Sequence, residues 1–217
     1  QKARVNHTLS KDGSSPLWAP DFDEHYHSVH GALTESMHVF VEAGLRQKKE
    51  GEGPIYIFEM GLGTGLNALL TMVEPSDRPM YYHSIELYPL LDNQWKELNY
   101  ADKVDHPAAA QYLESIHSCE WGIWHELSPS FHFKKTEKDL LSFQPGHKMD
   151  LIYFDAFAPS SQPELWTPEV MSRLYSFCRE VAVFTTYSAK GAVRRAHLSA
   201  GFEVEKIPGP PGKREML

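Results

Sequence analysis

The sequence is poor in cysteine, in long apolar runs and in net positive charge, and each shortage excludes a class of protein. Only Cys119 and Cys178 occur, too few for a disulfide-stapled secreted scaffold, so a reducing cytoplasm is the expected setting. No window approaches the roughly 18 consecutive apolar residues that a membrane span requires, which excludes a membrane protein. The net charge of −8 argues against a surface that grips nucleic acid everywhere, so any site for a polyanion must be local.

The remaining composition is that of one globular domain. Hydrophobic residues make up 41% of the 217 residues, enough to bury a sizeable core. Residues 1–20 are polar and lack the apolar stretch of a signal peptide, so we expect an N-terminal arm there and a single domain over residues 21–217.

Strand and helix patterns alternate along that domain. Short apolar runs predict strands at residues 55–58, 81–85, 131–133, 151–154 and 181–185, and helical periodicity appears at residues 31–45, 66–73 and 189–199. Near-continuous apolar strands are typical of a parallel sheet that is covered on both faces. We therefore expect a doubly wound α/β fold, decorated by a helical insertion near residues 95–124.

A cluster of three glycines follows the first strand and opens a helix. Gly61, Gly63 and Gly65 lie where backbone N–H groups can face a ligand, although such a turn can also serve only tight packing of strand against helix. The dinucleotide fingerprint requires a different spacing, G-x-G-x-x-G, and Glu59 would repel a pyrophosphate. An acid here suits a cofactor with an ammonium and a sulfonium group, which indicates S-adenosylmethionine.

Two further acids extend this predicted site. Glu86 ends the next strand and can accept both ribose hydroxyls of an adenosine. Asp139 follows the third strand, where it could accept from the adenine amino group or cap a helix ahead of Leu140.

Asp155 ends the strand at residues 151–154, at the edge of the sheet where doubly wound proteins bind ligands. A carboxylate there can orient an amine and help remove its proton, and the alternative is a cap for the next turn. The segment Ala156–Trp166, with Pro159 and Pro163, would then form a stiff loop over the substrate.

Other reactive residue types give weaker signals. His25, His27 and His30 are dense in sequence but do not share one face of an extended chain, so no metal site is expected. Both cysteines are expected to be buried thiols. The chain from Lys190 onward is locally basic, and Lys213 and Arg214 follow a Pro and Gly run from which they could meet phosphates, or simply be solvated.

These motifs together resemble one family. The run Phe58–Asn67, the run Asp150–Pro159 with Trp166, and the run Gly201–Leu217 are similar to the methyltransferase domain of the MnmC family, which modifies the wobble uridine of tRNA. The resemblance implies a Rossmann-like class I fold that transfers a methyl group from S-adenosylmethionine to the amine of 5-aminomethyl(-2-thio)uridine. Because the sequence ends at Leu217, no room is left for the FAD-dependent oxidase half of two-domain members, so we expect a stand-alone enzyme with no FAD and a separate oxidase acting upstream.

The resemblance also implies roles for individual residues. Asp155 would be catalytic. The cofactor would be contacted by Glu59, Gly61, Gly63, Thr64, Gly65, Asn67, Glu86 and Asp139, with Tyr26 and Glu35 closing over it. Substrate contacts would come from Phe157, Pro159, Trp166, Lys213 and Arg214.

Two other functions fit the same residues. One is an N-methyltransferase for a small molecule or polyamine, which the acidic overall charge would suit. The other is a non-catalytic module that senses a nucleotide.

Overall fold

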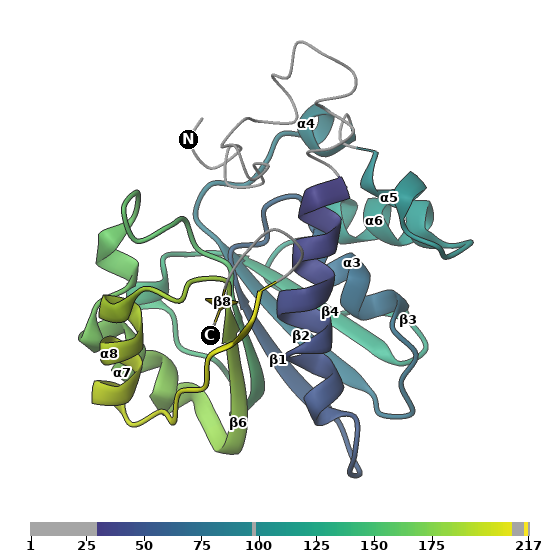
Figure 1. Cartoon of the computed structure of the whole chain (residues 1–217). Coiled ribbons are helices and arrows are strands. Elements are labelled where there is room, and N and C mark those ends of the chain that lie inside the picture. Colours follow the sequence, from purple (N-terminus) through teal and green to yellow (C-terminus); the bar gives the residue numbers. More distant parts are fainter. Residues whose placement is uncertain (1–29, 97–98, 210–214, 217) are drawn as a thin grey trace.

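The computed structural model describes residues 30–96, 99–209 and 215–216 (Figure 1). The predicted arm at residues 1–20 lies outside these ranges. A helix over residues 30–36 runs into a π-helical turn, η2. The elements from there on are η2 (Met37–Glu42), η3 (Leu45–Lys48), β1 (Ile55–Met60), α3 (Leu66–Val73), β2 (Met80–Glu86), α4 (Asp92–Lys96), α5 (Tyr100–Lys103), α6 (Ala109–Ser118), β3 (His125–Ser128), β4 (Phe131–Glu137), η4 (Leu140–Ser142), β5 (Met149–Phe154), η5 (Pro163–Leu165), α7 (Pro168–Phe177), β6 (Cys178–Thr186), α8 (Gly191–Ala200), β7 (Ile207–Pro208) and β8 (Glu215–Met216).

Six of the strands form one sheet in the order β3-β4-β2-β1-β5-β6. All neighbours are parallel except β3, which pairs antiparallel with β4 at one edge. The chain leaves β1 toward β2 on one side and reaches β5 on the other, so the order reverses beside β1. In open α/β sheets this switch point is where the carboxyl ends of the strands bind ligands. The predicted doubly wound, mostly parallel sheet is confirmed.

Helices cover both faces of the sheet (Figure 1). The helix that leads into η2 packs with α3 and α6 in one core cluster, which contains Val39, Leu69 and Ile116. A second cluster on the opposite face contains Phe177 of α7 and Val193 of α8. Strand β1 contributes to both, because alternate side chains of a strand point to opposite faces: Ile57 belongs to the first cluster and Phe58 to the second.

One predicted feature is wrong: strands and helices do not alternate throughout. Only the three-residue turn η4 connects β4 to β5. At the amino ends of the strands beside this connection, aromatic rings pack across the sheet instead, with Tyr81 stacked on His132 at 4.3 Å and on Tyr56 at 5.2 Å. The Arg179 guanidinium lies over the Tyr56 ring at 5.1 Å. Side chains on the strands thus contact one another where a helix would otherwise cover them.

The helices between β2 and β3 are short, and the longest of them, α6, packs against α3. In the described part of the chain, no helix is long and apolar enough to cross a membrane.

Candidate active site

The glycine-rich turn lies at the switch point of the sheet, between the end of β1 and the start of α3. Gly61, Gly63 and Gly65 all have positive φ, at 93°, 53° and 81°, a conformation that side-chain-bearing residues rarely adopt. A Cβ on Gly65 would also lie 3.0 Å from His117 Nε2. The predicted turn therefore depends on glycine for its backbone conformation and, at Gly65, for the close approach of α6.

Glu86 holds this turn from the neighbouring strand. Its side chain is buried, its Oε1 accepts from Gly63 N at 2.9 Å, and its Oε2 accepts from Tyr88 N at 3.2 Å. Glu86 thus ties the glycine turn to the end of β2.

Asp155 follows β5 directly and meets the start of α3. Its backbone N donates to Met60 O at 3.2 Å, which ties it to the end of β1. Its Oδ2 accepts from Asn67 Nδ2 at 3.0 Å. The half-buried carboxylate is thus held in the crevice between β1 and β5 by backbone and side chain together.

Glu59, the last but one residue of β1, is fully buried below the turn. Its Oε1 accepts from Ser84 Oγ at 2.8 Å. Burial, with a contribution from the charge of Asp155, raises the pKa of the Glu59 carboxyl to about 8, although Ser84 opposes the shift. Glu59 therefore holds a proton more tightly than an ordinary glutamate.

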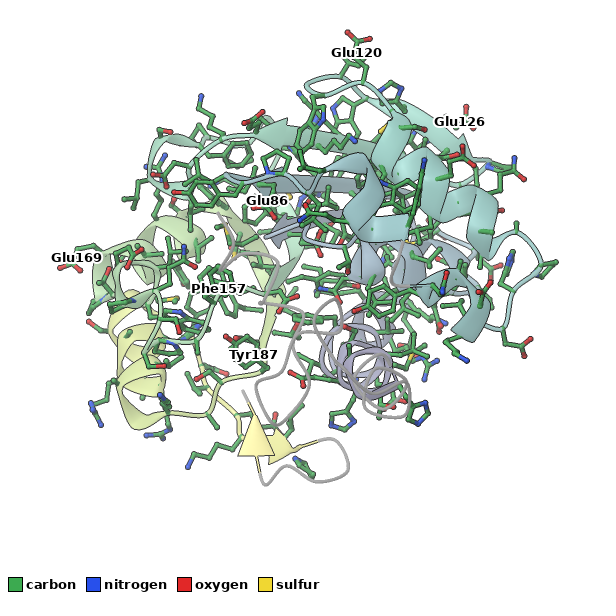
Figure 2. All side chains as sticks on the ribbon, turned by 90° about the horizontal axis from the view of Figure 1, so that it is seen from above. Glu86, Glu120, Glu126, Phe157, Glu169 and Tyr187 are labelled. Atoms are coloured by element: carbon green, nitrogen blue, oxygen red, sulfur yellow. The ribbon has the colours of Figure 1, made fainter. Side chains whose placement is uncertain are left out.

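A small cavity of about 60 Å³ joins several of the predicted residues. Its lining includes the three residues Gly61–Gly63, together with Thr64, Asn67, Asp155 and Glu35. Glu35 comes from the helix over residues 30–36, so this helix forms one wall of the crevice. Seen from above, Glu86, Phe157 and Tyr187 lie toward the middle of the molecule, whereas Glu120, Glu126 and Glu169 lie at its periphery (Figure 2).

The loop after β5 is held by aromatic residues. Trp166 is buried against Phe154, with ring centroids 4.9 Å apart, and its Nε1 donates to Phe157 O at 2.8 Å. The Tyr187 hydroxyl donates to Ala156 O at 2.7 Å. Phe157 and Pro159 are half-buried. Substrate contact by Phe157 and Pro159 stays a prediction, and Trp166 would act through the loop that it supports.

Asp139 caps the turn η4, since its Oδ1 accepts from Leu141 N at 3.1 Å. The capping alternative in the sequence is therefore observed. The cap uses only one oxygen of the Asp139 carboxylate. The cap therefore does not exclude contact between Asp139 and an adenine, which stays a prediction.

Sequence reasoning missed His117, which braces the glycine turn from α6. Its ring Nε2 lies 2.6 Å from Thr64 O, and its ring stacks on Trp95 at 4.4 Å. The buried Lys135 donates to His117 O at 2.6 Å. No local pattern could reveal this brace, because His117 and Thr64 lie 53 residues apart.

Three predicted residues, Tyr26, Lys213 and Arg214, lie outside the described residues. Within the described ranges, no group of three or more His, Cys, Asp or Glu side chains is arranged to hold a metal ion. Burial raises the pKa of both cysteine thiols, that of Cys178 to about 12, so neither thiol is activated as a nucleophile.

A larger hollow of about 1,080 Å³ runs along the outer edge of β6. It is lined by β6, by η2 and by residues 201–208, and none of the predicted site residues within the described ranges lines it. Its size alone therefore does not make it the active site, because the chemistry-bearing side chains gather at the switch point.

Comparison with known proteins agrees with this geometry. A family model described as S-adenosyl-L-methionine-dependent methyltransferase matches residues 102–217. The tRNA 5-methylaminomethyl-2-thiouridine biosynthesis bifunctional protein MnmC of Burkholderia thailandensis is 30% identical over 217 aligned residues, covering 92% of this chain and 32% of that protein. Its counterpart from Burkholderia multivorans is 31% identical, covering 97% of this chain and 34% of that protein.

A solved structure is similar as well. MnmC2 from Aquifex aeolicus superposes with a TM-score of 0.64 at 25% identity, over 86% of this chain and 60% of that one. The chain spans about a third of the length of the two bifunctional relatives. The family model covers more than half of the sequence, and the sheet with its glycine turn is the fold that the family resemblance implies. The chain belongs to the S-adenosyl-L-methionine-dependent methyltransferase family.

Proposed function

We propose that this chain methylates the amine of 5-aminomethyl(-2-thio)uridine at the wobble position of tRNA. The observation that carries the proposal is the position of Asp155, which is held by Asn67 in the crevice beside the glycine turn. The relatives' names supply the substrate: both are tRNA 5-methylaminomethyl-2-thiouridine biosynthesis proteins.

The residues around the crevice fit S-adenosylmethionine. The glycine turn lines a cavity at the start of α3, and Glu86 at the end of β2 is an acid of the kind that accepts from ribose hydroxyls. In our proposal Gly61, Gly63, Thr64, Gly65 and Asn67 surround the methionine part. Asp139 lies toward adenine, and Tyr26 and Glu35 close over the cofactor. When bound, the cofactor supplies a methyl group on a positively charged sulfur.

Asp155 performs the acid-base part of the reaction in this proposal. A free amine is mostly protonated at neutral pH and is then no nucleophile, so its proton must leave before methyl transfer. The carboxylate accepts a hydrogen bond from the amine, orients its nitrogen and takes up its proton. Asn67 keeps the carboxylate in one position, which matters because alignment supplies much of the rate in a displacement reaction.

The partners follow from the substrate. We place Phe157, Pro159 and Trp166 on the substrate side, and Lys213 and Arg214 against tRNA phosphates. From the family resemblance we also propose a separate FAD-dependent oxidase that acts upstream, and a cytoplasmic setting. The proposed domain spans residues 21–217, with the helices α4 to α6 as its insertion.

Mass analysis of wobble nucleosides tests the proposal directly. Undermodified tRNA that carries the aminomethyl uridine is incubated with the protein and methyl-labelled S-adenosylmethionine. We expect one labelled methyl group on the wobble nucleoside. Label on polyamines but not on tRNA would favour the small-molecule enzyme, and cofactor binding without transfer to any amine would favour the sensing module.

Binding of tRNA supplies a second test. Changing Lys213 and Arg214 together to Ala should weaken tRNA binding and make it less dependent on salt, because each phosphate contact releases counterions. Arg194→Ala is the matched control, since Arg194 is an exposed cation of α8 that the proposal does not use. Equal salt dependence in both variants and the wild type would contradict a role for the tail.

A further inference from the structure

Glu59 differs from the other acids of the site in its surroundings. Asp155 is half-buried and lines the cavity, whereas Glu59 is fully buried and does not line it. The carboxyl of Glu59 receives one donor, Ser84 Oγ, at 2.8 Å. An ionised carboxylate at such a depth is costly unless cations or several donors surround it.

Among the residues that the structure describes, the side chains that act on the Glu59 carboxyl come from three elements, and none of them is basic. Ser84 and Tyr82 approach from β2, Asn67 from α3 and Asp155 from the end of β5. Asn67 acts on both acids, since its amide donates to Asp155 at 3.0 Å and also stabilises the charged form of Glu59. Two carboxyl groups thus share one amide, and like charges so close do not both ionise readily.

Hydrogen-bond capacity gives an independent indication. Among the described residues, three buried polar atoms of this group have no partner in hydrogen-bond geometry: Glu59 Oε2, Asn67 Oδ1 and Tyr82 Oη. Two of these atoms, Glu59 Oε2 and Asn67 Oδ1, are acceptors, so a donor is missing between them unless one of them carries a proton. A proton on Glu59 Oε2 supplies that donor, whereas an ionised Glu59 leaves both oxygens as acceptors.

The titration of Glu59 agrees in direction. Burial raises its pKa to about 8, and the nearby Asp155 charge adds to the rise.

We propose that Glu59 is a positioning residue that acts as a neutral carboxylic acid, holding Asn67 and through it Asp155, so that of these two acids only Asp155 carries a negative charge. This inference rests on the proposed function of Asp155. The proposal also changes the role of Glu59 that is expected from the sequence. Glu59 would support the site through Asn67 and would not place a negative charge opposite the sulfonium.

Glu59→Gln is the test variant, because glutamine has the shape of a neutral glutamic acid and keeps a donor and an acceptor. Calorimetry measures Kd for S-adenosylmethionine and for S-adenosylhomocysteine, which lacks the positive charge on sulfur. The two ligands differ by the methyl group and by the charge on sulfur. Because the methyl group is the same in every experiment, the change in the ratio from wild type to variant reports the charge opposite the sulfonium. Glu126→Gln is the control, since Glu126 is exposed at the edge strand β3.

At pH 7 we expect the ratio for Glu59→Gln to lie within about twofold of the wild-type ratio. At pH 9.5 the wild type should prefer the sulfonium by a further ~3-fold or more as Glu59 ionises, whereas the variant should not. Equal ratios up to pH 9.5 would also support a neutral carboxyl, with a proton held more tightly. A loss of about tenfold in the variant's ratio at pH 7 would overturn the proposal, since Glu59 would then carry charge there.

Turnover and spectroscopy complete the test. The kcat of Glu59→Gln should stay within about threefold of wild type and that of Glu59→Ala should fall ~10-fold or more, because only glutamine can still hold Asn67. Near-UV circular dichroism checks that each variant is folded. The infrared difference spectrum between wild type and Glu59→Gln at pH 7 should contain the C=O band of a protonated carboxyl. A carboxylate band in its place would refute the proposal of a neutral Glu59. The infrared measurement needs no ligand, so it decides the charge state of Glu59 even if the protein does not methylate tRNA. A failure to methylate tRNA would contradict only the proposed function.

Discussion

The two ends of the parallel sheet use charged side chains in opposite ways. At the amino ends, the Arg78 guanidinium donates to five backbone carbonyls between residues 48 and 54, at 2.7 to 3.3 Å. At the carboxyl ends, the carboxylates of Glu86 and Asp155 border the glycine turn, where they accept from Gly63 N and from Asn67 Nδ2.

The difference separates stability from function. The N–H groups of the Arg78 guanidinium donate to backbone carbonyls of the protein. Arg78 therefore stabilises the segment 48–54 and is not positioned to bind a ligand. The acids at the other end lie at the switch point of the sheet, where a ligand would bind. Substitutions at the amino ends should therefore change stability alone, and those at the carboxyl ends should change activity or affinity alone.

Asp155→Asn should produce the largest effect. The amide keeps the size of the side chain but cannot take up a proton, so we expect turnover to fall ~10²-fold or more with near-normal cofactor binding. Single-turnover rates on tRNA measure the loss, and calorimetry with the cofactor measures binding. Unchanged turnover would mean that Asp155 takes no part in the reaction. It would also contradict the functional role that we assign to the carboxyl ends of the strands.

Arg78→Ala should lower the free energy of unfolding by about 2 kcal/mol, because several backbone carbonyls lose their donors together. Urea unfolding measures this, and the cofactor Kd should not change. Arg194→Ala, at an exposed arginine on α8, should stay within about 0.5 kcal/mol of wild type. A change in cofactor affinity without a change in stability at Arg78 would contradict the division between the two ends.

Glu86→Gln should weaken cofactor binding about tenfold, because hydroxyl donors bind a charged acceptor more strongly than a neutral one. The glutamine can still accept from Gly63 N, so stability should change little. Glu137→Gln is the matched control, since Glu137 pairs with Glu86 in register on β4 but is exposed. If both variants lost the same affinity, a general loss of negative charge rather than ribose recognition would explain it.

The smallest effect is expected for His117→Ala, which removes the brace on Thr64 O without touching a ligand. We expect cofactor affinity to fall about fivefold, the equivalent of roughly 1 kcal/mol for one neutral hydrogen bond. His125→Ala removes a similar contact to a backbone carbonyl, that of Glu120, at a site away from the turn. The affinity of the His125→Ala variant for the cofactor should equal that of the wild type.

The sequence predicted well those parts whose signals are local. An apolar run followed by glycines predicts β1 and α3, and the predicted bounds of α3, residues 66–73, are those observed. Asp155 and Glu86 were predicted because each ends an apolar strand. Carboxyl ends of parallel strands meet at one edge of the sheet, so a local signal sufficed to bring these acids together.

One local signal was missed: the helix α7 was not predicted, although Thr167 caps it and Pro168 opens it, a combination that marks a helix start. The other missed features depend on contacts between residues distant in sequence. The absence of a helix between β4 and β5 depends on rings that pack across strands, which periodicity along the chain cannot report. The neutral state expected of Glu59 depends on burial by α3, β2 and β5 together.

The outer edge of β6 limits how the molecule can associate with its neighbours in solution. This strand ends the order of the sheet, and an open edge invites another strand to add to it. Val181 interrupts the edge: its φ of 56° is unusual for a β-branched residue, its carbonyl accepts from Lys48, and the pairing register with β5 shifts nearby. Charged Arg179 and Glu180 precede it. The kink and the charges together make this edge a poor template for the addition of another strand.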